Sequence, residues 1–76
     1  MLKIKKDIDL KVLEKYGLKR VKIKDKWAYE REESFYSTKE HIIIFEESRN
    51  IILDISYGQT IEILFYMIKD GIIENI

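Results

Sequence analysis

Two isoleucine-rich runs, separated by three polar residues, constrain the fold of this chain more than any other feature. The runs are His41–Glu46 and Asn50–Tyr57, with Glu47-Ser48-Arg49 between them. Isoleucine is β-branched and fits the pleated, half-buried surface of a sheet. Two such runs joined by a short polar segment predict an antiparallel β-hairpin.

A four-residue loop over Glu46–Arg49 gives this hairpin apolar residues on both faces. We therefore expect it to be central in a sheet or covered on both sides, since either arrangement removes apolar surface from water. The expected cross-strand pairs are Ile44 with Ile51, Ile42 with Leu53, Ile43 with Ile52, and His41 with Asp54.

Residues 19–31 predict a second hairpin, with alternating apolar and basic residues and a turn near Lys24-Asp25-Lys26. A two-residue loop at Asp25-Lys26 and a three-residue loop over 24–26 are both considered. The three-residue loop is preferred because it keeps one face apolar and pairs opposite charges on the other. That register pairs Ile23 with Trp27, Val21 with Tyr29 and Arg20 with Glu30, and it turns both aromatic rings away from the lysines.

Two helices are predicted from their end signals. Asp9 is a good N-cap for a short first helix, and Gly17 supplies the left-handed residue that ends it. The second helix spans Ile61–Asp70, with Thr60 as its N-cap and Gly71 at its end. Its apolar residues run almost all round, so it has more apolar surface than one sheet face covers. The expected core residues are Ile42, Ile44, Ile51, Leu53, Leu64 and Ile68.

The remaining segments complete an α+β fold. Met1–Lys6 predicts a short edge strand, and the polar stretch 32–40 predicts a loop. We expect one domain over residues 1–76, an antiparallel sheet of about four strands with a short N-terminal helix and a C-terminal helix packed on it. With no cysteine, neither a disulfide nor a thiolate metal site supports this small core.

Charge and hydropathy limit the partners. No run approaches the roughly 18 apolar residues of a membrane span, and no signal-peptide pattern is present, so we expect a cytoplasmic protein. The net charge is zero, yet residues 1–26 carry ten Lys/Arg and four Asp/Glu, whereas residues 27–76 carry four and ten. Such asymmetry marks a nucleic-acid or membrane contact, or two halves that neutralise each other after folding.

Residue patterns for catalysis are missing. His41 is the single histidine and has no nucleophile-elbow serine, and the abundant glutamates match no calcium-loop or zinc motif. The three glycines are isolated, which excludes phosphate-binding loops. We expect no enzymatic activity, cofactor, metal or small-molecule substrate.

Two binding functions remain. The first is protein binding, because the helix and the hairpin together have more apolar surface than one small core can bury. The candidate binding residues are Phe35, Tyr36, Phe45 and Tyr66. The simplest partner to cover this apolar surface is a second copy of the chain in a two-fold homodimer, and the other possible partner is a foreign protein. The alternative function is nucleic-acid binding by a basic stripe of Arg20, Lys22, Lys24 and Lys26.

The two ends of the chain resemble a group of small orphan proteins encoded by phages, prophages and plasmids of low-GC Gram-positive bacteria. The resemblance covers Asp9–Leu18 and Ile68–Glu74, and the isoleucine- and lysine-rich composition without proline fits it. Some small phage proteins of this size, anti-CRISPR proteins among them, inhibit host defence by binding a host protein. The resemblance therefore implies a host-defence inhibitor, and it implies no particular functional residue.

Overall fold

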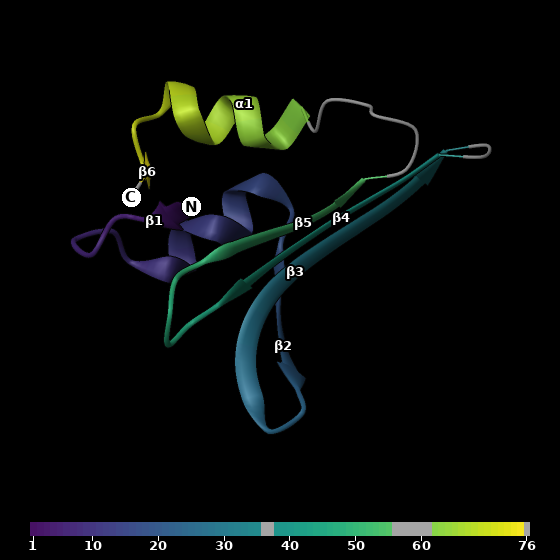
Figure 1. Ribbon diagram of the computed structural model, residues 1–76, viewed down its shortest axis with the longest axis horizontal. Helices are drawn as coiled ribbons and strands as arrows, with labels where there is room; N and C mark the ends of the chain where they lie inside the picture. The colour runs from purple at the N-terminus through teal and green to yellow at the C-terminus, as the bar shows by residue number, and fades with distance from the viewer. Residues whose placement is uncertain (36–37, 56–61, 76) are drawn as a thin grey trace.

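The computed structural model describes residues 1–35, 38–55 and 62–75, and their elements form an α+β fold (Figure 1). Four strands form an antiparallel sheet in the order β2-β3-β4-β5, and β1 and β6 pair in a separate two-stranded sheet. The predicted fold class is confirmed. The elements are β1 (Leu2–Ile4), the 3-10 helix η1 (Leu10–Tyr16), β2 (Lys19–Ile23), β3 (Lys26–Phe35), β4 (Thr38–Phe45), β5 (Ile51–Ile55), α1 (Glu62–Lys69) and β6 (Ile73–Asn75).

The isoleucine-rich hairpin is β4–β5, and its predicted register is confirmed. Ile44 pairs with Ile51, and Ile42 pairs with Leu53. β4 is central between β3 and β5, and one face of the hairpin is buried under the helices. No described helix covers the other face, where Ile52 is 46% exposed. Of the two expected arrangements, β4 takes the central position, whereas the described residues do not cover the hairpin on both sides.

The β2–β3 hairpin uses neither of the two predicted registers. Its loop is Lys24-Asp25, and both residues have positive φ, at 48° and 67°. This backbone matches the type I′ turn, whose twist suits two-residue hairpins and usually attracts Asn-Gly. Because no glycine is present, the sequence gives no signal for it. The resulting pairs are Ile23 with Lys26, Lys22 with Trp27, Val21 with Ala28 and Arg20 with Tyr29, so Trp27 and Tyr29 share a face with Arg20 and Lys22.

The polarity of the stretch 32–40 predicted a loop, but its described residues, 32–35 and 38–40, lie in strands; residues 36–37 are outside the described part. β3 continues to Phe35, and β4 begins at Thr38, with pairing that runs from Glu32–His41 to Phe35–Thr38. This end of the hairpin extends past α1 in Figure 1. The hydrogen bonds between strands join backbone groups whatever the side chains are, so polar composition is a poor guide to such an extension.

Both predicted ends of the first helix are confirmed, whereas Thr60, the predicted N-cap of the second helix, lies outside the described residues. Asp9 accepts a hydrogen bond from the backbone amide of Lys11 at 3.0 Å, and Gly17 ends the segment with φ of 82°. The amide of Leu18 then donates to the carbonyl of Leu13 at 3.3 Å, which closes the cap. The first helix is a 3-10 helix rather than an α-helix. α1 ends in the same way, because the amide of Ile72 donates to the carbonyl of Met67 at 3.3 Å.

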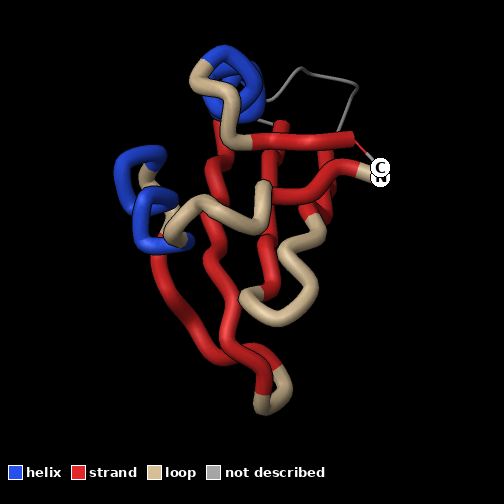
Figure 2. Tube along the Cα trace, turned by 90° about the vertical axis from the view of Figure 1, so that its left-hand side faces the viewer, coloured by secondary structure: helices blue, strands red, loops and turns tan. Residues whose placement is uncertain are grey.

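The core lies between one face of the sheet and the two helices (Figure 2). η1 contributes Leu13 and α1 contributes Met67, both fully buried. Leu53 and Leu64 are half-buried, but Ile68 is 55% exposed, so its predicted burial is wrong. The reason is the rotation of α1, which turns Met67 inward. The buried cluster is Ile4, Leu13, Leu18, Tyr29, Ile42, Ile44, Ile51, Met67 and Ile72.

None of the helices in the described part of the chain is long and apolar enough to cross a membrane. The described ends of the chain lie side by side, because Leu2 of β1 pairs with Asn75 of β6.

A hydrogen bond between the helices predicts a loss of stability at alkaline pH. The hydroxyl of Tyr16 donates to Oδ2 of Asp70 at 2.5 Å. Burial, then this hydrogen bond and the carboxylate charge, raises the pKa of Tyr16 from 10.0 to about 12. The folded state therefore holds the proton more tightly than the unfolded chain, and stability falls as pH rises from about 10 to about 12.

Urea unfolding of the parent and of Tyr16→Phe across that pH range measures this effect. We expect Tyr16→Phe to lose less stability than the parent between the two pH values, because phenylalanine has no proton to release. Equal losses in the parent and in Tyr16→Phe would contradict the assignment.

Candidate functional site

The outer side of α1 carries three large exposed side chains. Phe65, Tyr66 and Ile68 are 60%, 46% and 55% exposed, and we call them the α1 outer surface. The rings of Phe65 and Tyr66 meet edge to face, with centroids 6.2 Å apart. Because an α-helix has 3.6 residues per turn, the burial of Met67 directs these three away from the core.

The second apolar surface is the uncovered side of the four-stranded sheet, which we call the open sheet face. Strand alternation places its residues opposite the core residues, and each is next to a core-facing neighbour. Ala28 is buried and Ile52 is exposed, while the others are half-buried. The apolar residues of this face are Val21, Ile23, Ala28, Ile43, Phe45 and Ile52.

The four predicted protein-binding residues do not gather on one surface. Phe45 pairs with Ala28 on the open sheet face, whereas Tyr66 belongs to the α1 outer surface on the covered side. The backbone of Phe35 pairs with Thr38, but its side chain lies outside the described part, as does all of Tyr36. Sequence reasoning missed Phe65 and Ile68, because a helix that is apolar all round does not reveal which side packs.

A third surface surrounds Trp27, which is 44% exposed. The guanidinium carbon of Arg20 lies 4.1 Å from the centroid of the indole, and Nζ of Lys22 lies 5.6 Å from it. Arg20 also donates to Glu46 from Nε at 2.6 Å and from Nη2 at 3.3 Å. This hydrogen-bonded pair raises the pKa of Arg20. The group is therefore an aromatic ring beside two cations, one of which is paired with a carboxylate.

The predicted basic stripe is divided by the observed register. Arg20 and Lys22 lie on the face of Trp27, Lys24 lies in the turn, and Lys26 pairs with Ile23 on the other face. The stripe is therefore not one continuous surface. The prediction that Trp27 and Tyr29 face away from the lysines is also wrong, because both rings share a face with Arg20 and Lys22. An aromatic ring beside basic side chains is what single-stranded nucleic acid requires, so one argument against that function no longer applies.

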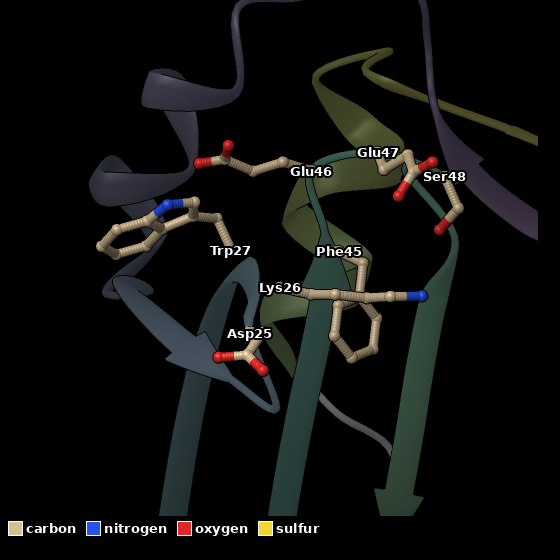
Figure 3. Close-up of a pocket in the computed structure, with 7 residues that line it drawn as sticks. All are labelled: Asp25, Lys26, Trp27, Phe45, Glu46, Glu47 and Ser48. Carbon is tan, nitrogen blue, oxygen red and sulfur yellow. The ribbon is translucent and has the colours of Figure 1, made fainter.

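A depression of about 550 Å³ lies where the β2–β3 and β4–β5 turns meet. Figure 3 shows Trp27 and Glu46 pointing to one side and Phe45 and Lys26 to the other, as strand alternation requires. The depression combines two aromatic rings, three carboxylates and one lysine, and it holds no histidine or arrangement of nucleophile and base. Its lining is Asp25, Lys26, Trp27, Phe45, Glu46, Glu47 and Ser48.

His41 lies on the open sheet face, opposite Asp54 as predicted. Its Nε2 lies 3.1 Å from Oε2 of Glu30, so the structure adds a hydrogen-bond partner that the sequence did not indicate. Within the described residues, no three histidine or acidic side chains gather closely enough to hold a metal ion. His41 is thus placed as one member of a hydrogen-bonded surface pair.

Comparison with known proteins returns no match, whether to a protein-family model, to a curated protein or to a solved structure. The proposals below therefore depend on the surfaces described above.

Proposed function

We propose that this chain is a small non-enzymatic protein-binding module, and that the α1 outer surface contacts its partner. The observation that supports this is the exposure of Phe65, Tyr66 and Ile68 on one short helix. Burial of apolar surface contributes about 25 cal/mol of favourable free energy per Å², so covering three such side chains favours association. Aromatic residues also dominate the energetics of protein interfaces.

The simplest partner is a second copy of the chain, because a two-fold axis lets one surface meet itself. A foreign protein is the other partner class. The resemblance of the chain ends to phage and plasmid proteins makes host-defence proteins, such as CRISPR nucleases, the first foreign partners to test. Binding to such a protein inhibits it by occupying a surface, which requires no chemistry from the chain.

Sedimentation equilibrium of the parent and of Phe65→Ala tests the self-association. A host-defence nuclease assay with the same two proteins tests inhibition. Inhibition by the parent and its loss in Phe65→Ala support a foreign partner on the α1 outer surface.

A second candidate function is single-stranded nucleic-acid binding at Trp27. The observation that favours it is the exposed indole beside Arg20 and Lys22, since bases stack on aromatic rings in basic grooves. Two features oppose it. Glu46 already engages Arg20, and Asp25 and Glu47 lie close to the same depression.

We expect no micromolar binding of single-stranded DNA or RNA at physiological salt, because the neighbouring carboxylates repel phosphates. Trp27 is the single tryptophan, so its fluorescence reports on any complex. Titration with oligothymidine and oligouridine measures it. Micromolar binding that weakens steeply with salt and disappears in Lys22→Glu would make this the leading function.

A further inference from the structure

β2 is an edge strand of the four-stranded sheet. It pairs with β3 on one side, and no strand of the described residues pairs with its outer side. Figure 2 shows it as the outermost strand, leading away from η1. An edge strand presents a row of unpaired amide and carbonyl groups that can pair with another extended chain.

The side chains along this edge are basic. Lys19, Arg20 and Lys22 are exposed, and Lys24 follows in the turn. Arg20 has Glu46 as its ion-pair partner, whereas the other three form no salt bridge with any residue that the structure describes. The edge therefore has an uncompensated positive charge on a strand that contains no acidic residue.

The other side chains of β2 give the edge a second property. Val21 and Ile23 are half-buried and point to the open sheet face, whereas Arg20 and Lys22 point to the face of Trp27. A strand added beside β2 would therefore meet apolar neighbours at every second position and basic neighbours between them.

This pattern argues against a second copy as the occupant. Two β2 strands paired antiparallel would bring basic side chains next to basic side chains, which is destabilising across a sheet. Lysines on edge strands oppose self-pairing for this reason. The same charges attract a strand of opposite sign, so charge complementarity selects the partner.

We propose that the outer edge of β2 binds an extended acidic segment of a partner protein by β-strand addition. The segment alternates acidic and apolar residues. The acids lie on the face of Lys22, whose ammonium forms no salt bridge with the described residues, and the apolar residues extend the open sheet face beside Val21 and Ile23. Main-chain hydrogen bonds supply affinity, and the alternating side chains supply specificity. The proposal rests on the chain being a protein-binding module, but it does not depend on the α1 outer surface.

The test uses a synthetic peptide of alternating glutamate and valine, about six residues long, the length of a typical strand. Binding is followed by Trp27 fluorescence and by hydrogen exchange of the β2 amides. We expect saturable binding that weakens with salt and slows exchange along β2. Lys22→Glu should weaken binding by roughly tenfold, because it turns an attraction into a repulsion. Lys69→Glu, the same charge change on α1, should leave binding unchanged, as should Phe65→Lys.

Three outcomes would overturn the proposal. The first is a peptide that causes no change in fluorescence or exchange with the folded parent protein. The second is equal binding by a peptide N-methylated at alternate residues, which shows that charge alone is responsible. The third is displacement of the peptide by a single-stranded oligonucleotide that binds more tightly, which assigns the surface to nucleic acid. Since Phe65→Lys separates the two surfaces, failure here is distinguishable from failure of the α1 proposal.

Discussion

Replacement of Ile44 by alanine is expected to lower the free energy of unfolding by about 2–5 kcal/mol, the range for truncating a buried isoleucine. Ile44 is fully buried and lies in the middle of the sheet, where it pairs with Tyr29 on β3 and Ile51 on β5. Removing its side chain leaves a cavity in the layer against which Met67 and Leu13 pack. A domain of this size has a total stability of only about 5–15 kcal/mol, so the loss is a large fraction of it.

Ile52→Ala is the matched control for this substitution. It makes the same chemical change on the neighbouring strand, but its side chain is 46% exposed on the open sheet face. We expect a loss of about 1 kcal/mol or less, because little cavity forms. Thermal unfolding followed by circular dichroism separates the two, since each kcal/mol shifts the midpoint by about 4–8 °C in a domain of this length. Similar midpoints for the two variants would contradict the assignment of the covered face.

The elements that the sequence predicts well are those with local signals. Gly17 and Gly71 end their helices because both positions need positive φ, which glycine adopts at little cost. The β4–β5 register follows from loop length and from the strict alternation of strand faces. These rules involve residues close together in the chain, so a pattern of a few residues is enough to determine them.

The failures involve choices that the local pattern leaves open. The Lys24-Asp25 turn has no glycine, and a shift of the register by one residue moved Trp27 to the face of Lys22. α1 is apolar on all sides, so only its tertiary packing decides that Met67 is buried and Ile68 exposed.

The candidate surfaces depend on the register of the β2–β3 hairpin and on the rotation of α1, which local sequence patterns do not determine. The Arg20–Trp27 contact exists because Lys22 pairs with Trp27, and the α1 outer surface exists because of one helix rotation. Long-range contacts were also invisible in the sequence. The guanidinium of Arg49 donates to the carbonyls of Lys5 and Ile8 at 2.6 and 2.7 Å, and these residues lie more than forty positions earlier.

Self-association through the α1 outer surface is expected to be the most visible solution property of the chain. We expect sedimentation equilibrium at tens of micromolar, a range where a micromolar dimer is well populated, to give a mass near that of two chains. Two α1 helices that meet across a two-fold axis cover Phe65 and Ile68 of both copies, which are now 60% and 55% exposed. The basic edge of β2 takes no part in this contact, because like charges there oppose a two-fold approach.

Phe65→Ala should weaken this dimer by roughly thirtyfold, because truncating a central aromatic residue of an interface costs about 2 kcal/mol or more. Ile52→Ala is the control, since it removes a comparably exposed side chain from the open sheet face. If Ile52→Ala dissociates the dimer and Phe65→Ala does not, the interface is the open sheet face. If the parent has the mass of one chain throughout the range, there is no homodimer. The exposed aromatic pair on α1 then remains available for a foreign protein, and inhibition assays with host proteins become the decisive measurement.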